Sequence, residues 1–405
     1  MKVFVLNRGS STIKCFLYDF KKAPRQLISP LWEAHLQWKN NFEEPFLTIK
    51  NEQGANHSET IKEKTAGLAL RYLMHFLFEG KTAVLSSLNE IDVIGHRIVH
   101  GGKYFKESVH VTPHVKEQIH LLSELAPLHN LSELEGVEIL EQLLEKTPQI
   151  AVFDTAFHHT LPKAAQIYPG PYRWYEEGIQ RYGFHGISFQ YCSRRGAEML
   201  NCDLNGLRMV ICHLGSGASL CAIKNGKSID TTMGFTPLEG LMMDTRCGSI
   251  DPGILLYLLE KKKKTLRELS SELYKESGLL GISGISSDMQ DVIEKSLNGN
   301  PRAAVALDIY THRLNTLIGS MIAALKGLDV LIFTAGIGEN APLIRERVCD
   351  NFSFLEMELD KIKNEKISSE DRELSTEKSK IKALLIHTQE AFQIACECWK
   401  RTSGA

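Results

Sequence analysis

The sequence predicts an α/β fold built from two similar halves that face each other across a phosphate-binding cleft. The strand–turn–strand segments Val3–Tyr18 and Met209–Ile223 carry this prediction, because each places a turn of glycine and hydroxyl residues between two apolar runs. Aligning the segments pairs Gly9 with Gly215, where the absent side chain lets an anion approach the backbone. Either segment alone is most simply an ordinary hairpin, whereas one copy in each half favours a duplicated phosphate-binding domain.

Length, charge and cysteine content bound the possible functions. The 405 residues suffice for two domains, and the net charge of −2 gives no electrostatic basis for binding nucleic acid or an anionic membrane. No apolar run is long enough for a transmembrane helix, and the stretch before Asn7 is too short for a signal peptide. The nine cysteines lack disulfide or zinc spacing, which is typical of reduced thiols in a cytoplasmic protein.

In the first half, the pattern predicts strands and then a helical region over residues 60–90. A buried strand and a glycine loop are expected over Asp92–Gly102, followed by an amphipathic helix over Val115–Leu125 and a second helix. The segment Ile150–Thr155 reads as a short strand that ends in Asp154. A carboxylate at the carboxyl end of a strand lies where ligands of α/β sheets gather.

The second half continues from its strand–turn–strand segment into loops and helices. Gly278–Asp288 reads as a glycine- and serine-rich loop that leads into a helix, and Asp329–Asn340 reads as a buried strand followed by a glycine turn. Ile381–Ile386 is the last expected strand, and Thr388–Glu390 begins a C-terminal helix.

These elements divide into two expected domains. The first comprises residues 1–154 with about 385–405, because the C-terminal helix is expected to return to it. The second comprises residues 155–384 and is expected to bind the nucleotide.

The glycine-rich turns match neither of the two common nucleotide motifs. No Gly-Lys-Ser/Thr follows four spacer residues, so there is no Walker A loop. The sequence Gly336-Ile337-Gly338 lacks the third glycine of a dinucleotide fingerprint. Two phosphate hairpins and a glycine turn under adenosine suit instead the actin-like ATPase fold, which is ribonuclease H-like, is shared with hexokinase and Hsp70, and holds its nucleotide in an interdomain cleft.

Several motifs make the resemblance specific. They are Asn7-x-Gly-Ser-Ser-Thr-x-x-Lys14, Gly95-His-Arg97-x-Val99-His-Gly-Gly, Ala126-Pro-Leu-His129-Asn, Phe153-Asp154-Thr-Ala-Phe-His, Arg181-Tyr-Gly-Phe-His185-Gly, Asp244-Thr-Arg246 and Phe333-Thr-Ala-Gly-Ile-Gly-Glu-Asn340. In this order, over nearly the whole chain, they resemble the acetokinase family. The resemblance implies reversible transfer of the γ-phosphoryl group of ATP to acetate, giving acetyl phosphate and ADP. It also implies Mg²⁺, for which Mn²⁺ can substitute, and a homodimer that forms through the second domain.

The resemblance assigns roles to five catalytic residues. Arg97 would hold the acyl substrate, Arg246 the transition state and His185 the moving phosphoryl group, with His129 assisting nearby and Asp154 orienting substrate and metal. These residue types fit, because phosphoryl transfer needs positioning and cations around spreading negative charge. Asp154 need not act as a strong base, since a carboxylate nucleophile is already ionised at neutral pH.

The resemblance also implies the binding residues. Asn7 and Glu390 would fix Mg²⁺, largely through water, as this cation prefers. The pocket for the methyl group would be formed, beside Arg97, by Val99, Leu128, Phe184 and Pro237. The nucleotide would be held by Lys14, His213, Leu214, Gly215, Ser216, Gly217, Asp288, Met289, Gln290, Gly336, Ile337, Gly338, Glu339 and Asn340.

Three departures from the family pattern concern the nucleotide. Ser216 stands where relatives usually carry Asn, and Gln290 stands where an Arg often lies against adenine. Asp244 replaces a usual Gly two residues before Arg246. A carboxylate at this position is expected either to pair with Arg246 or to repel phosphate, and either effect would change turnover.

Other readings stay open. Outside the family, an Arg in a strand-end loop is usually a structural ion pair, and His96 and His100 on a strand are core histidines more readily than zinc ligands. One rival function is a kinase of another short acid such as propionate, which Val99 disfavours by only ~1–3 kcal/mol per methylene. The other rival is a non-catalytic nucleotide-binding regulator, which would be expected to lack the four residues Arg97, Asp154, His185 and Arg246.

Overall fold

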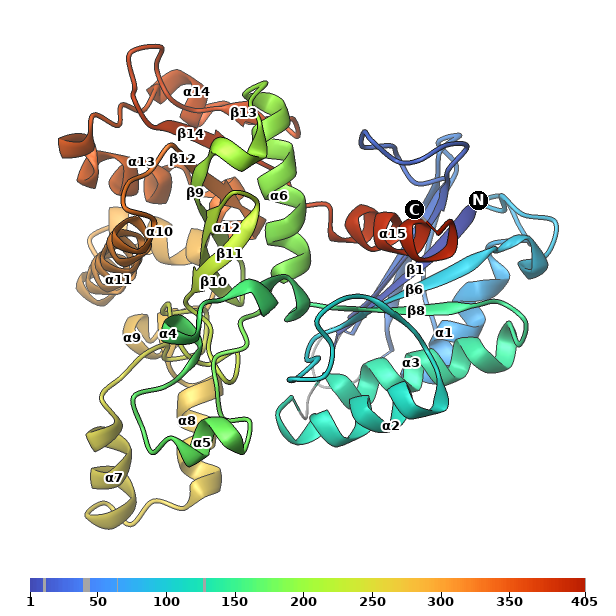
Figure 1. The fold of residues 1–405 in the computed structure, drawn as a ribbon, viewed down its shortest axis with the longest axis horizontal. Helices are drawn as coiled ribbons and strands as arrows, with labels where there is room; N and C mark the ends of the chain where they lie inside the picture. Colours follow the sequence, from blue (N-terminus) through green and yellow to red (C-terminus); the bar gives the residue numbers. More distant parts are fainter. Residues whose placement is uncertain (10–11, 39–43, 64, 127–128, 405) are drawn as a thin grey trace. The chain divides into compact units, whose positions relative to one another are not determined.

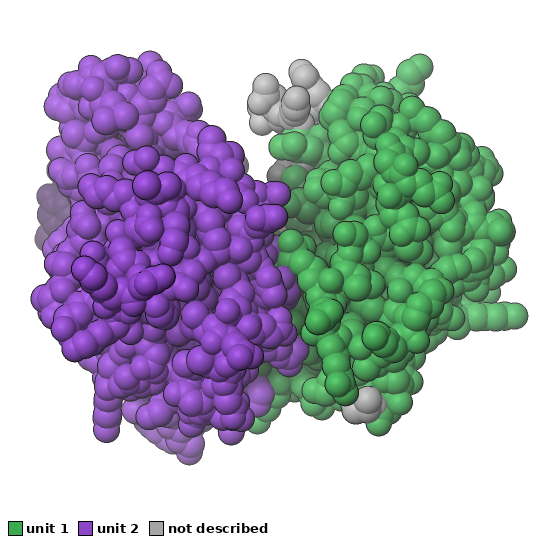
Figure 2. Space-filling model, turned by 90° about the horizontal axis from the view of Figure 1, so that it is seen from above, with its two compact units in different colours: residues 1–156, 389–405 green, residues 157–388 purple. Residues whose placement is uncertain are grey.

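The computed structural model describes residues 1–9, 12–38, 44–63, 65–126 and 129–404. The chain divides into two compact units (Figures 1 and 2). Unit 1 comprises residues 1–156 and 389–405, so both ends of the chain belong to it. Unit 2 is the continuous stretch 157–388.

Unit 1 is built on an eight-stranded sheet with the order β5-β4-β3-β2-β1-β6-β8-β7. Its strands are β1 (Lys2–Arg8), β2 (Thr12–Asp19), β3 (Trp32–Gln37), β4 (Phe46–Asn51), β5 (Asn56–Thr60), β6 (Val93–Ile98), β7 (Val109–His110) and β8 (Gln149–Phe153). Strands β1, β6 and β8 are parallel neighbours, so their carboxyl ends meet at one edge of the sheet.

Helices cover both faces of this sheet (Figure 1). The helices α1 (Ala66–His75), α2 (Pro113–Leu121) and α3 (Asn130–Leu143) lie on one face, and α15 (Glu390–Thr402) lies on the other. A Cβ atom added to Gly95 of β6 would lie 2.6 Å from Sγ of Cys398 and 2.7 Å from Cγ2 of Ile394. Glycine is therefore what lets α15 approach the sheet so closely.

Unit 2 repeats the central arrangement of unit 1. Its six-stranded sheet has the order β11-β10-β9-β12-β14-β13. The strands are β9 (Arg208–Leu214), β10 (Ala218–Lys224), β11 (Lys227–Thr231), β12 (Val330–Thr334), β13 (Arg372–Glu373) and β14 (Lys382–Leu385). In both units a three-stranded antiparallel meander is followed by two parallel strands: β3-β2-β1-β6-β8 corresponds to β11-β10-β9-β12-β14. The predicted duplicated α/β fold is confirmed.

The helices of unit 2 are α4 (Lys163–Gln166), α5 (Arg173–Glu176), α6 (Gly186–Met199), α7 (Pro252–Glu260), α8 (Leu266–Lys275), α9 (Gly278–Ser283), α10 (Met289–Leu297), α11 (Pro301–Leu325), α12 (Ala335–Asn340), α13 (Pro342–Asn351) and α14 (Lys361–Glu365). The longest, α11, has the expected start signals, with Pro301 in its first turn and the Asn300 side chain accepting from the N–H of Ala303. No helix within the described ranges is both long and apolar enough to span a membrane.

Three elements differ from the sequence-based expectation. The loop predicted over Gly278–Asp288 begins with the short helix α9 over Gly278–Ser283. The helical region predicted over residues 60–90 contains α1 only over Ala66–His75, and turns follow it. The chain stops being helical although Phe76, Leu77 and Phe78 continue the apolar run. The glycine turn after β12 is itself the short helix α12, which begins at Ala335 with a positive φ of 65°.

Candidate active site

In unit 1, the sheet brings Arg97 and Asp154 together at its carboxyl edge. Arg97 lies on β6 and Asp154 follows the parallel strand β8, whose Val152 is the register partner of Arg97. Nε of Arg97 donates to the two carboxylate oxygens of Asp154 at 3.1 and 3.2 Å, and Nη2 donates to Oδ2 at 2.6 Å. The Asp154 side chain is 1 % exposed and that of Arg97 is 19 % exposed, so the carboxylate is shielded from water while the forked contact holds the guanidinium in a fixed orientation.

Asn7 and Glu390 belong to the same cluster. Nη1 of Arg97 donates to Oδ1 of Asn7 at 3.3 Å, and Glu390 is the first residue of α15. Burial alone would lower the pKa of Arg97, but the negative charges of Asp154 and Glu390 raise it above its ordinary value. The guanidinium is therefore a permanent cation among oxygen atoms that a divalent cation can also use.

Three further predicted residues of unit 1 lie on or next to elements that adjoin β1 and β6. Val99 is buried just past the end of β6, and Lys14 is exposed on β2, where it is the register partner of Asn7. His129 is the N-cap of α3, and its carbonyl accepts from the Ser132 hydroxyl at 2.9 Å. Leu128 of the predicted methyl pocket lies outside the described residues.

In unit 2, two stacked histidines lie beside the second phosphate turn. The rings of His185 and His213 are 4.0 Å apart and nearly parallel. Nδ1 of His185 bonds the Ser219 hydroxyl at 2.8 Å, and Nδ1 of His213 bonds the Ser188 hydroxyl at 2.9 Å. These bonds fix the orientation of both rings. His185 has a left-handed backbone with φ of 58°, a conformation that clusters at functional sites.

Arg246 approaches the same turn. A Cβ atom added to Gly217 would lie 3.4 Å from Nη1 of Arg246 and 3.5 Å from Nε2 of His185. Arg246 is anchored by a hydrogen bond from Nη1 to the carbonyl of Pro237 at 3.0 Å, and burial lowers its pKa below the ordinary value. Two nitrogen-bearing side chains therefore converge on the backbone of a glycine turn, an arrangement suited to an anion.

Phe184 and Pro237, predicted for the methyl pocket, are neighbours of these residues in the chain or in space. Phe184 is buried next to His185, and its carbonyl bonds Nε2 of His158 at 3.0 Å. Pro237 supplies the carbonyl that anchors Arg246. Both therefore lie close to the histidine and arginine of unit 2.

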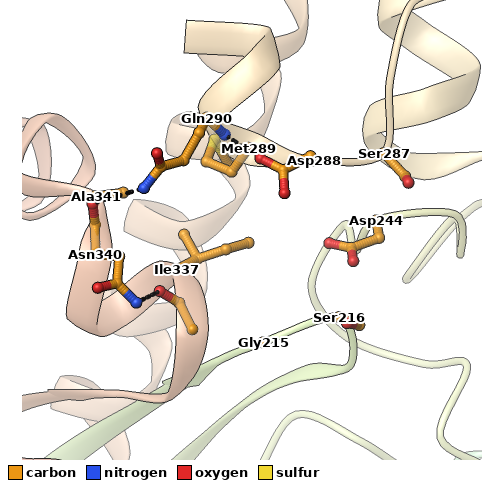
Figure 3. A pocket seen from close by; sticks show the side chains of 11 residues that line it. Gly215, Ser216, Asp244, Ser287, Asp288, Met289, Gln290, Ile337, Asn340 and Ala341 are labelled. Carbon is orange, nitrogen blue, oxygen red and sulfur yellow. Dashed lines mark hydrogen bonds between the residues drawn. The ribbon is translucent and has the colours of Figure 1, made fainter. Parts of the chain in front are cut away.

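A pocket of about 280 Å³ in unit 2 collects most of the predicted nucleotide residues (Figure 3). Its walls are the residues Gly215, Ser216, Asp244, Ser287, Asp288, Met289, Gln290, Gly336, Ile337, Asn340 and Ala341. A Cβ atom added to Gly336 would meet no other atom within 4 Å, so this turn is open. The predicted residues His213, Leu214, Gly217, Gly338 and Glu339 do not line this pocket, and Lys14 belongs to unit 1. The Glu339 carboxylate instead accepts from the N–H of Ala335 at 2.8 Å and so holds the start of α12.

Asp244 lies on the pocket side of its loop. Figure 3 shows its carboxylate between Ser287 and Ser216. Burial raises the pKa of Asp244 to about 6, the Ser216 hydroxyl lowers it, and the charge of Asp288 raises it. The positive charge of Arg246 also lowers the pKa of Asp244, but among the described side chains Nη1 of Arg246 bonds the Pro237 carbonyl and forms no ion pair with Asp244, which lines the pocket.

His96 on β6 and His100 just past its end are part of the core. His96 is 1 % exposed and bonds the Gln149 side chain, and Nδ1 of His100 accepts from the N–H of Gly102 at 3.0 Å. Burial lowers the pKa of His96 to about 4. No group of three metal-binding side chains is found within the described part of the chain.

Sequence reasoning missed several side chains that hold the predicted ones in place. Glu133 and Asn130 in the first turn of α3 bond the backbone of Val99 and His100, while Ser188 and Ser219 orient the two stacked histidines. Asn130 is the last residue of the Ala126-Pro-Leu-His129-Asn motif, and this was the available signal. The others sit on elements that pack against the site, and nothing in their local sequence marks them.

Comparisons with known proteins identify the family. Residues 2–396 match the acetokinase family. An acetate kinase from Nostoc punctiforme is 50 % identical over 402 residues, covering 99 % of each chain. The crystal structure of Porphyromonas gingivalis acetate kinase has a TM-score of 0.88 at 38 % identity, covering 97 % of this chain and 98 % of that one. A propionate kinase from Francisella tularensis has a TM-score of 0.87 at 35 % identity, covering 98 % of both chains. These structures share the duplicated actin-like ATPase fold. The chain belongs to the acetokinase family.

Proposed function

We infer that this protein is an acetate kinase, which transfers the γ-phosphoryl group of ATP to acetate and so forms acetyl phosphate and ADP, reversibly. The observation that carries this conclusion is the forked Arg97–Asp154 ion pair at the carboxyl edge of the sheet. A guanidinium held rigid on one side by a buried carboxylate presents its remaining N–H groups to a second carboxylate. In an acetate kinase, the second carboxylate is that of acetate, which accepts the phosphoryl group.

The residues of unit 1 support a role in holding the acceptor. Nη1 of Arg97 bonds only the Asn7 oxygen, at a long 3.3 Å, among the described residues, so it can turn to acetate. We propose that Arg97 and Asp154 orient the carboxylate, and that Val99 contacts the methyl group together with Leu128, Phe184 and Pro237. Acetate is already ionised at neutral pH, so its oxygen attacks phosphorus without a base.

The residues of unit 2 support a role in holding the nucleotide and the moving phosphoryl group. Ser216, Asp288 and Gln290 line an open pocket under the Gly336 turn. We propose that Arg246 and His185, which converge on Gly217, bind the phosphoryl oxygens as their negative charge spreads in the transition state. His129, the N-cap residue of α3, is proposed to assist.

Mg²⁺ is proposed as the cation of the reaction. The amide oxygen of Asn7 and the carboxylate of Glu390 at the start of α15 belong to the Arg97 cluster, and such hard oxygen donors suit Mg²⁺ held partly through water. When bound, the cation neutralises charge on the transferring phosphoryl group. Asn7 and Glu390 would orient its water ligands, and Asp154 would help to align it with the acceptor.

The test is formation of acyl phosphate, trapped with hydroxylamine, from ATP and Mg²⁺ with acetate, propionate and butyrate side by side. We expect acetate to give the highest kcat/KM. Propionate in first place would favour the rival substrate, which the similarity to a propionate kinase keeps open. No product from any acid, despite measurable ATP binding, would favour the rival reading of a nucleotide-binding regulator.

We also propose that the protein is a homodimer in the cytoplasm. Helix α7 and the start of α8 expose Ile254, Leu256, Tyr257 and Leu266, with exposed fractions between 45 and 75 %. An exposed apolar face of this kind is typical of a surface that packs against another copy. Leu256→Asp together with Tyr257→Asp should convert the dimer to a monomer in light scattering.

The proposed cytoplasmic location is supported by the cysteines. Nine free cysteines, six of them buried, fit a reducing compartment.

A further inference from the structure

The first turn of α3 holds the backbone that follows Arg97. The N–H of Val99 donates to Oε2 of Glu133 at 2.9 Å, and the N–H of His100 donates to Oδ1 of Asn130 at 3.1 Å. Asn130 donates back to the His100 carbonyl at 3.1 Å. Because Val99 lies past the last residue of β6, side chains of a helix, and not the sheet ladder, set the position of this segment.

Glu133 is only half satisfied in this arrangement. Its side chain is 2 % exposed, and its Oε1 is buried without a hydrogen-bond partner among the described residues. A buried carboxylate with an unpaired oxygen is costly, whereas the protonated acid is not charged. Burial raises the pKa of Glu133 to about 8, while the Val99 N–H and the charge of Arg97 lower it. This raised pKa favours the neutral, protonated acid at pH 7.

The charged neighbours of Glu133 come from three strands of the sheet. Arg97 on β6 and Arg8 on β1 lower its pKa, and Asp154 after β8 raises it. Arg8 is itself 5 % exposed and pairs with Oε2 of Glu135 at 2.6 Å. While Glu133 is neutral, the positive charge of Arg97 is opposed only by the carboxylates of its own cluster. Ionisation of Glu133 would add a further negative charge near the arginine.

We propose that Glu133 is a positioning residue of the acyl-substrate site, which fixes the Val99 backbone so that Arg97 and Val99 keep their relative positions. The inference rests on the proposed function, in which these two side chains contact the carboxylate and the methyl group of acetate. Glu133 acts through the Val99 N–H and contacts no reacting atom. Its neutral state also keeps additional negative charge away from the place where an anionic acid binds.

Three variants test this role. Glu133→Ala removes the acceptor and leaves the Val99 N–H buried and unpaired, so we expect KM for acetate to rise about five- to tenfold with little change in KM for ATP. Glu133→Gln keeps an acceptor oxygen and the neutral charge, and should restore KM for acetate at pH 7. The control is Glu141→Gln on the same helix, since Glu141 is half exposed and pairs only with Lys116 at 2.6 Å in the described structure. It should match the wild type in every constant.

The pH profile supplies a readout that a purely structural role would not move. In the wild type, KM for acetate should rise above about pH 8, because Glu133 then loses its proton and opposes the binding of an anion. Glu133→Gln cannot ionise and should give a flat profile over the same range. This comparison needs only the conservative variant, so it remains informative if Glu133→Ala fails to fold.

The outcomes separate the inference from the proposed function. A wild-type enzyme without acyl phosphate formation contradicts the proposed function, and the inference falls with it. An active wild type whose KM for acetate is the same in Glu133→Ala contradicts the inference alone. So does a Glu133→Gln variant whose pH profile coincides with that of the wild type. If KM for acetate and KM for ATP rise equally in Glu133→Ala, the substitution has damaged the enzyme generally, and this result also contradicts the inference.

Discussion

Arg246 and Asp244 lie two residues apart in one loop but have different surroundings. Arg246 is anchored to the Pro237 carbonyl beside Gly217, whereas the Asp244 carboxylate lines the pocket with Ser216. The arginine is thus placed for the transferring group and the aspartate for the nucleotide. We therefore expect kcat to report on Arg246 and KM for ATP to report on Asp244.

We expect Arg246→Ala to lower kcat by about 10²–10³-fold and to leave KM for ATP nearly unchanged, because its interaction strengthens as charge spreads in the transition state. Steady-state kinetics with varied ATP and acetate measures both constants. Arg246→Lys keeps the charge without the planar fork and should recover only part of the rate. A large loss of ATP affinity at unchanged kcat would contradict this role.

We expect Asp244→Gly to lower KM for ATP at pH 7.5. With a pKa of about 6, the Asp244 carboxylate is ionised at pH 7.5, and its negative charge repels the phosphates of ATP. As the pH falls below 6, the carboxylate gains a proton and the repulsion disappears. KM for ATP in the wild type should therefore rise between pH 5 and pH 7, whereas the variant should lose this rise. Asp244→Asn keeps the shape without the charge and should behave like Asp244→Gly. Wild-type affinity in both variants would mean that Asp244 does not act on the nucleotide.

Among the elements, α15 depends on its close approach to β6. Its first residue, Glu390, belongs to the Arg97 cluster, so the position of the helix affects both the core and the site. Gly95 makes this approach possible, since an added Cβ atom would lie 2.6 Å from Cys398. The packing of α15 against Gly95 on β6 therefore also sets the position of Glu390, the candidate metal ligand at the first residue of α15.

Gly95→Ala should therefore lower the melting temperature and impair Mg²⁺-dependent activity, because the new methyl group displaces α15. Overpacking of this kind costs about 1–3 kcal/mol. The control is Gly319→Ala inside α11, where the added Cβ atom meets nothing within 4 Å and the change should stabilise the helix. Thermal unfolding and a magnesium titration of activity measure the two effects. Equal melting temperatures for the two variants would contradict the packing argument.

At the scale of the whole molecule, the two units differ in how the chain builds them. Unit 1 needs both ends of the chain, because α15 covers one face of a sheet whose strands begin at Lys2. Unit 2 is one continuous stretch, and every residue that lines the pocket of Figure 3 belongs to it. A continuous segment with its own core can fold alone.

We expect residues 157–388, expressed alone, to fold and to bind ADP, with a melting temperature that rises with ADP concentration. Residues 1–156 alone should not fold stably, since the sheet face that α15 covers would be exposed. Circular dichroism and thermal shift measurements report both outcomes. A folded unit 2 fragment without any ADP-dependent shift would contradict the assignment of the pocket to the nucleotide.

The sequence by itself determined the duplicated α/β fold and the family, because both are encoded in local patterns. A glycine and hydroxyl turn between two apolar runs occurs once in each half, and the Arg97, Asp154, His185 and Arg246 motifs are short and contiguous. Local patterns also explain where prediction failed. The apolar run after α1 favoured a longer helix, but turns follow His75.

Only the tertiary structure decided which side chains support those motifs. Glu133 meets Val99 across 34 residues, and Asp154 meets Arg97 across 57, so neither contact follows from local spacing. Only the folded chain directs the Asp244 carboxylate into the pocket and leaves Oε1 of Glu133 buried without a described partner. Burial and charge at these positions are properties of packed elements. They arise from long-range contacts that a stretch of sequence does not contain.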